Sequence, residues 1–76
     1  MVCQIKMKTT EDAVRVSREA AKAGIDMIVS CGSSMIDPRS LLGLFNFVGK
    51  DAKLVAPDNT NPQVLQKLVK RMGVIA

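Results

Sequence analysis

Few side chains of this 76-residue chain could act as bases, nucleophiles or metal ligands. The sequence contains no histidine, so it offers no imidazole base, no phosphohistidine, no histidine metal ligand and no nucleophile activated by histidine. Its two cysteines, Cys3 and Cys31, are 28 positions apart and form no CxxC pair, which is too few for a zinc site or a disulfide framework. We therefore expect reduced, partly buried thiols, no metal, no cofactor and no enzyme activity.

The segment Cys31-Gly32-Ser33-Ser34 places a thiol before a glycine and two hydroxyls. A cysteine that accepts phosphate needs backbone amides around its thiol and an arginine close behind it. Seven residues separate Cys31 from Arg39, and a predicted strand lies between them. We interpret the segment as a hairpin turn rather than a phosphate loop.

Three basic residues share one face of a predicted helix. Arg15, Arg18 and Lys22 lie at i, i+3 and i+7 and are called here the basic strip. Glu11 lies four residues before Arg15 and Glu19 three before Lys22, so we interpret the strip as a solvated face with ordinary helix ion pairs. A docking surface for an acidic protein partner is the alternative.

Basic residues outnumber acidic ones 11 to 7, which gives a net charge of +4. A small basic nucleic-acid-binding module is therefore an alternative function. The only aromatic residues are Phe45 and Phe47, so the chain lacks the stacking platform that single-strand binders use. We do not expect a nucleic-acid partner.

The elements that must position these side chains follow from the apolar pattern. Val2 to Met7 has apolar residues at alternate positions, which predicts a half-buried strand. Thr9 followed by acidic residues is typical of a helix start, and Gly24 is typical of a helix end. These signals predict a helix from about Thr10 to Ala23.

The rest of the chain alternates short strands and helices. We predict strands over 25–30, 34–37 and 52–56, a short helix over 40–48, and a helix over 62–72 that begins at a proline and ends at a glycine. The order is β-α-β-β-α-β-α. It predicts one α+β domain, residues 1–76, in which helices pack on one face of an antiparallel sheet.

The short helix over 40–48 is apolar nearly all round, unlike a surface helix with a single apolar stripe. Its apolar residues are Leu41, Leu42, Leu44, Phe45, Phe47 and Val48. Some of them should stay exposed unless a partner covers them, which favours protein docking. The alternative is that the helix tilts and buries them all.

The element order and one motif resemble HPr, the phosphocarrier protein of the bacterial phosphoenolpyruvate-dependent sugar phosphotransferase system. The motif is Asp37-Pro38-Arg39-Ser40-Leu41-Leu42-Gly43-Leu44-Phe45. In that family a helix opens with a regulatory serine followed by two large apolar residues, a glycine and two more apolar residues. The resemblance implies an open-faced two-layer sandwich, with a four-stranded antiparallel sheet and three helices on one face.

The resemblance also implies site residues. Ser40 would accept phosphate from a dedicated kinase, and Leu41, Leu42 and Phe45 would form the apolar knob that docks onto enzyme I, sugar permease domains or a regulator. Two structural interpretations of Ser40 stay open: it serves only to start its helix, or Asp37 is the cap and Ser40 lies inside the first turn.

The chain departs from the family where the family does its chemistry. Counting back without gaps from Ser40, Thr9 falls at the position of the phosphate-accepting histidine, Glu11 at that of its arginine and Asp12 at that of a usual proline. A threonine hydroxyl is a poorer reversible phosphate acceptor than an imidazole, and two acids would repel the incoming phosphate. We expect no phosphocarrier activity and no catalytic residue.

These observations predict a non-catalytic, HPr-like protein with a regulatory or docking role. An orphan structural domain with no phosphotransferase link is a further alternative. No stretch is long and apolar enough to predict membrane insertion, and no secretory signal is recognisable, so we expect a cytoplasmic protein. We expect a monomer, with a homodimer through the apolar helix as the alternative.

Overall fold

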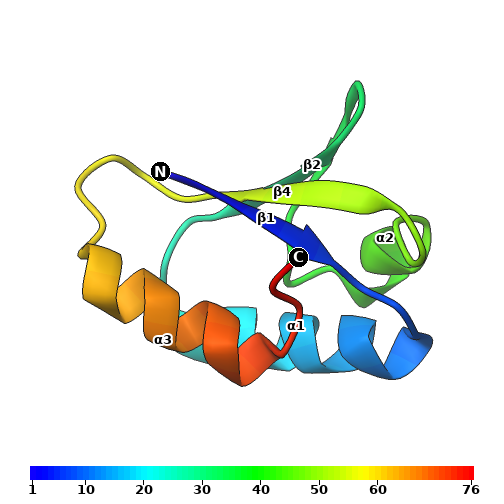
Figure 1. Cartoon of the computed structure of the whole chain (residues 1–76), viewed down its shortest axis with the longest axis horizontal. Coiled ribbons are helices and arrows are strands. Elements are labelled where there is room, and N and C mark those ends of the chain that lie inside the picture. Colours follow the sequence, from blue (N-terminus) through cyan, green and yellow to red (C-terminus); the bar gives the residue numbers. More distant parts are fainter.

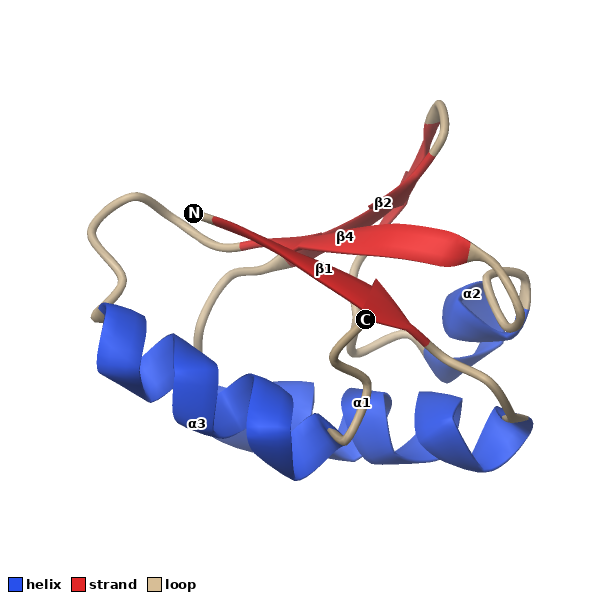
Figure 2. Cartoon of the chain, viewed as in Figure 1, coloured by secondary structure: helices blue, strands red, loops and turns tan.

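The computed structural model describes all 76 residues, which form two layers (Figures 1 and 2). The elements in order are β1 (Val2–Lys6), α1 (Thr10–Ala23), β2 (Ile28–Cys31), β3 (Ser34–Ile36), α2 (Leu41–Phe45), β4 (Asp51–Val55) and α3 (Pro62–Met72). The strands form one sheet in the order β1-β4-β2-β3, and every neighbouring pair is antiparallel. The helices lie on one face of this sheet, so the predicted α+β sandwich is confirmed.

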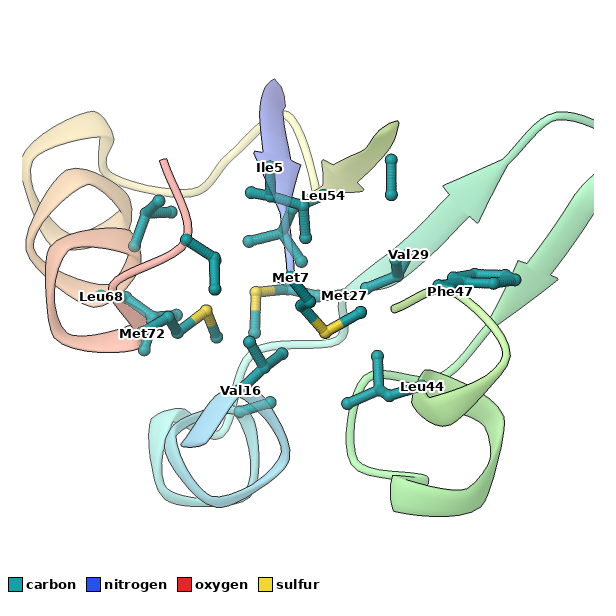
Figure 3. Packing of buried hydrophobic residues seen from close by; sticks show 14 of the residues in the cluster. Ile5, Met7, Val16, Met27, Val29, Leu44, Phe47, Leu54, Leu68 and Met72 are labelled. Atoms are coloured by element: carbon teal, nitrogen blue, oxygen red, sulfur yellow. The ribbon is translucent and has the colours of Figure 1, made fainter. Parts of the chain in front are cut away.

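The core lies between the sheet and the helices (Figure 3). Alternate residues of β1, β2 and β4 point into it, as Ile5, Val29 and Leu54 do, because successive strand side chains face opposite sides of a sheet. The helices contribute the buried residues Ala13, Val16, Ala20, Leu44, Leu65, Leu68, Val69 and Met72. The other face of the sheet is open.

The two long helices begin and end where local signals predict. The Thr9 hydroxyl accepts a hydrogen bond from the Asp12 amide at the start of α1, and the Asn61 side chain accepts one from the Gln63 amide at the start of α3. Gly24 and Gly73 follow these helices with φ of 67° and 69°, the left-handed conformation that ends a helix.

The β2–β3 hairpin also forms as predicted. Cys31 pairs with Ser34 across a two-residue turn whose first residue, Gly32, has a φ of 60°. Glycine takes this conformation at the first central position of a tight hairpin turn.

Two elements differ clearly from their predicted bounds, whereas the bounds of β1, β3 and β4 differ by a single residue at one or both ends. β2 begins at Ile28 rather than residue 25, since the segment before it connects α1 to the sheet. α2 ends at Phe45 rather than Val48 because the chain tightens there: the Phe47 amide donates to the Leu44 carbonyl at 2.9 Å, a bond spanning three residues. The resulting turn directs Phe47 into the core.

A contact between the C-terminal segment and β1 is absent from the sequence predictions. The Lys6 amide donates to the Val74 carbonyl at 2.8 Å, and Ile5 and Ile75 form an isolated antiparallel bridge. Figure 1 shows this segment rising from α3 to β1. It covers part of the outer edge of the sheet and buries Val74.

No helix combines the length and the apolar character needed to cross a bilayer, the longest being the 14-residue α1.

Candidate functional site

The N-terminus of α1 is closed by a carboxylate from its own first turn. Oδ2 of Asp12 accepts hydrogen bonds from the backbone amides of Lys8 at 2.8 Å and Thr9 at 3.3 Å. The Thr9 hydroxyl accepts from the Asp12 amide in return, which completes a capping box. The Lys8 amide is the main cause that lowers the pKa of Asp12, with the Thr9 amide and the Arg15 guanidinium adding to the effect.

Arg15 joins this carboxylate to α3. Its guanidinium pairs with Oδ1 of Asp12, and its Nε donates to the Met72 carbonyl at 2.7 Å. The predicted Arg15–Glu11 pair does not form, and Glu11 is exposed with no ion-pair partner. Asp12 replaces Glu11 as the partner because the capping box holds its side chain beside the helix.

This arrangement places a negative charge at the start of α1. The Asp12 carboxylate binds the amides of Lys8 and Thr9, which directly precede the helix, and the nearest guanidinium is paired with it. An incoming anion would have to displace a like charge. Thr9 supplies the only hydroxyl at the cap, and that hydroxyl accepts a backbone hydrogen bond.

The basic strip does not stay together as one surface. Arg15 turns toward α3, whereas Arg18 is exposed with no acidic partner. Lys22 lies 3.8 Å from Oε2 of Glu19, and Oε1 of the same carboxylate accepts from Nε of Arg71 at 3.1 Å. The predicted ion pair between Glu19 and Lys22 is therefore present.

The apolar residues of α2 divide between core and solvent. Leu42 is 79% exposed and Phe45 is 38% exposed, whereas Leu44 is fully buried. Leu41 is half-buried and packs against the core, so Leu42 and Phe45 are the most exposed residues of the predicted knob. We call these two residues the α2 knob.

α1 flanks the α2 knob with residues that the sequence interpretation missed. The Ser17 hydroxyl donates to the Arg39 carbonyl at 3.0 Å, which fixes this side of α1 against the segment that leads into α2. Val14 lies three residues before Ser17, on the same side of the helix, and is 43% exposed. No signal in the sequence indicates this side of α1, because the contact that fixes it joins residues 22 positions apart.

Ser40 takes the cap position of α2 without capping it. Its φ and ψ are −87° and 100°, and its hydroxyl accepts no capping hydrogen bond. The side chain that organises the turn is Asp37, whose Oδ1 accepts from the Arg39 amide at 2.9 Å. Ser40 therefore serves the start of its helix by position, without a capping bond from its side chain. The second interpretation is wrong, because Ser40 precedes α2 and does not lie inside its first turn.

Arg39, immediately before Ser40, is held by acidic side chains. Its Nη2 lies 2.6 Å from Oδ2 of Asp37 and 4.0 Å from Oδ1 of Asp26. The Arg39 side chain, followed by the Arg39 amide, lowers the pKa of Asp37 to about 2. The same contact with Asp37 raises the pKa of Arg39.

Both cysteines are free and half-buried, as predicted. The Cys31 thiol donates to the Asp51 carbonyl at 3.4 Å. No group of three or more cysteine, aspartate or glutamate side chains converges on a point that could hold a metal ion.

Comparison with solved structures finds HPr phosphocarriers. HPr-C-His from Thermoanaerobacter tengcongensis matches with a TM-score of 0.70 at 20% identity, over 96% of this chain and 93% of that chain. The histidine-containing phosphocarrier protein of Mycoplasma matches with a TM-score of 0.70 at 17% identity, over 95% and 89%. The phosphocarrier protein HPr from Bacillus anthracis strain Ames matches with a TM-score of 0.69 at 14% identity, over 93% and 92%.

No family model and no curated protein matches the sequence. At these low identities the structural likeness concerns the fold, and the chain has the HPr fold.

Proposed function

We propose that this chain, which has the HPr fold, is a non-catalytic docking protein that binds other proteins through the α2 knob and cannot carry phosphohistidine. The observation that carries the proposal is the combination of an exposed apolar pair on α2 with an α1 N-terminus closed by Asp12.

The loss of phosphate transfer is argued from two features. The chain has no histidine, and the Asp12 carboxylate, bound to the Lys8 and Thr9 amides, holds a negative charge at the start of α1. Reversible phosphoryl transfer needs an acceptor of moderate basicity and a cationic site for the phosphate. Thr9, Glu11 and Asp12 supply neither.

The docking surface predicts the chemistry of its partner. Leu42 and Phe45 offer an apolar centre, and Val14 is a further exposed apolar residue on α1. Arg18, on the outer face of the same helix, has no acidic partner. A partner should therefore present an apolar pocket with an acidic rim. We propose enzyme I, a sugar permease domain or a regulator of a phosphotransferase system as that partner.

Ser40 gives the surface a site that phosphorylation could regulate. Its hydroxyl is exposed, is free of a capping bond and lies directly before the α2 knob. A phosphate there would add about two negative charges. Repulsion from an acidic rim would then weaken docking.

The phosphate test uses the full chain mixed with enzyme I and phosphoenolpyruvate, followed by a search for acid-labile phosphate. We expect none, and acid-labile phosphate on the wild-type chain would contradict the proposal. A genuine histidine-containing phosphocarrier in the same assay shows that the enzyme I is active.

The docking test compares Leu42→Asp with Val64→Asp, which places the same charge at an exposed apolar position of α3. We expect Leu42→Asp to weaken binding to purified enzyme I or permease domains about a hundredfold, as loss of an interface anchor does, whereas Val64→Asp should bind like wild type. Equal binding by both variants would contradict docking through α2.

The Ser40 test compares Ser40→Asp with Ser40→Ala in the same binding assay. Charge repulsion should weaken binding by Ser40→Asp, whereas Ser40→Ala should bind like wild type because the hydroxyl makes no capping bond. Equal binding would rule out a charge-dependent switch while leaving docking itself in place.

A further inference from the structure

The outer side of β1 is an incompletely covered sheet edge. On the inner side, Met1 and Ala56 exchange backbone hydrogen bonds of 2.9 and 2.8 Å, so the odd-numbered residues of this strand point their backbone groups toward β4. In an antiparallel ladder, the backbone groups of successive residues point alternately toward the neighbouring strand and away from it. The backbone groups of Val2, Gln4 and Lys6 therefore point outward.

The C-terminal segment satisfies only part of this outward row. The Lys6 amide donates to the Val74 carbonyl, and the Gln4 carbonyl accepts from the Ala76 amide at 3.4 Å. The Gln4 amide and both backbone groups of Val2 have no backbone partner on that side. Unpaired groups of this kind are a template for a further strand.

A groove runs between this free edge and α3. Its apolar lining comes from Cys3, Val69, Ile75 and Ala76, and its polar lining from Gln4, Gln66 and Lys70. Every second side chain of a strand added to β1 would point into this groove, because side chains alternate along a strand. The edge supplies main-chain bonds, and the groove supplies side-chain selectivity.

The charges beside the groove favour an acidic ligand. α3 contains Lys67, Lys70 and Arg71 and no acidic residue. Arg71 pairs with Glu19 of α1, whereas Lys70 has no ion-pair partner. An acidic side chain placed opposite Lys70 would neutralise this charge.

We infer that the groove between β1 and α3 binds an extended peptide segment of a partner protein, which adds to β1 as an antiparallel strand and turns apolar and acidic side chains toward α3. This site lies on different elements from the α2 knob and does not depend on the function proposed for that knob.

The test uses a capped hexapeptide of sequence Thr-Val-Thr-Glu-Thr-Val, titrated into the isotope-labelled full chain to about 1 mM, where even weak binding is visible. We expect saturable shifts of the backbone amide signals of Val2, Gln4, Lys70 and Ile75. A peptide N-methylated at alternate amides should not bind, because it cannot complete the ladder. Absence of saturable shifts with the unmodified peptide, or shifts confined to β3 or α2, would overturn the inference.

Charge reversal supplies the matched pair of variants. Lys70→Glu should weaken the peptide about tenfold, whereas Lys67→Glu, the same change outside the groove lining, should alter affinity by less than about twofold. Equal losses of peptide affinity in the two variants would overturn the role of Lys70. A control without peptide follows the amide signals of Val2 and Gln4 as the protein concentration rises. If these signals shift and the chain sediments as a dimer, the edge is instead assigned to a second copy of the chain.

Discussion

Asp12 decides what the N-terminus of α1 can do. Its carboxylate accepts two backbone hydrogen bonds and pairs with Arg15. Anions are favoured at helix N-termini because free amides and the helix dipole meet there. In this chain the favoured anion is part of the protein, so the local electrostatics that would attract phosphate stabilise the fold instead.

Asp12→Ala should lower the free energy of unfolding by about 1 kcal/mol at pH 7, the typical value for a lost cap. The pKa of Asp12 is lower in the folded chain than in the unfolded chain. The stabilisation is therefore complete above the unfolded value near 4 and is lost as pH falls through the lower folded value. Urea unfolding followed by circular dichroism, which suits a chain without Trp or Tyr, should show the difference between variant and wild type shrinking below about pH 4.

Glu11→Ala is the matched control for that experiment. Glu11 is exposed and has no ion-pair partner, so its loss should change stability by less than about 0.5 kcal/mol at any pH. A pH-independent difference between Asp12→Ala and wild type would contradict the assigned role of the carboxylate.

Arg15→Met should destabilise the chain by about 1.5 to 3 kcal/mol, because it removes a charged donor from the Met72 carbonyl and a partner from Asp12. Arg18→Met removes an equal charge with no such contact and should lie within about 0.5 kcal/mol of wild type. Thermal and urea unfolding of the two variants distinguish them. Equal stabilities would show that the link from α1 to α3 contributes nothing.

At the scale of elements, α2 is defined by its tight packing on β3. A Cβ at Gly43 would lie 3.1 Å from Cδ1 of Ile36 and 3.4 Å from Cγ2 of the same side chain. Alanine favours a helix over glycine by up to about 1 kcal/mol, and this contact opposes the gain. The glycine therefore allows close approach of α2 to Ile36 at a cost in helix propensity.

Gly43→Ala should accordingly change stability little by itself, by less than about 0.5 kcal/mol, since the half-buried Ile36 side chain must move by a few tenths of an ångström. In an Ile36→Val background, which removes Cδ1, the same substitution should stabilise by about 0.5 to 1 kcal/mol. A double-mutant cycle by urea unfolding measures the coupling. Additive effects would show that the close contact has no energetic consequence.

The sequence predicted the elements whose limits are set locally and missed those set by packing. Both bounds of α1 were predicted correctly because Thr9 and Gly24 act within one turn of the helix. The end of α2 was predicted three residues late, since the bond from the Phe47 amide to Leu44 accompanies burial of the Phe47 ring. The bridge between Ile5 and Ile75 joins the two ends of the chain, and no local pattern predicts it.

The same division holds for the candidate site. The exposure of Leu42 and Phe45 was predicted from the HPr-like motif, but Leu41 packs partly against the core. The partner of Arg15 was predicted as Glu11 from helix spacing, although the spacing of Thr9 and Asp12 already indicated a capping box. That Ser40 carries no capping bond depends on the turn held by Asp37 and could not be predicted from residue types.

At the scale of the whole molecule, most paired charges serve to join segments that are distant in sequence. Glu19 links α1 to Arg71 of α3, and the N-terminal amine contacts Asp58 at 3.3 Å. The cations without a partner are Lys8, Arg18, Lys50, Lys53, Lys67 and Lys70, which lie on loops, on both long helices and on the open face of the sheet. Because they do not form one stripe, the surplus charge favours several small contacts over a continuous nucleic-acid surface.

The C-terminal segment shows how a small domain gains stability and protects its edge together. Val74 is 1% exposed, and its carbonyl accepts from the Lys6 amide. Removing residues 74–76 should cost about 2 to 4 kcal/mol, from the lost burial of one valine and its hydrogen bond. It should also lengthen the unpaired edge of β1 and promote association at high concentration.

Ile75→Ala, which keeps the backbone contacts, is the control and should cost less than about 1 kcal/mol, because that side chain is mostly exposed. Urea unfolding and sedimentation velocity measure the two effects; a truncated chain as stable and as monomeric as wild type would show that the segment neither completes the core nor covers the edge.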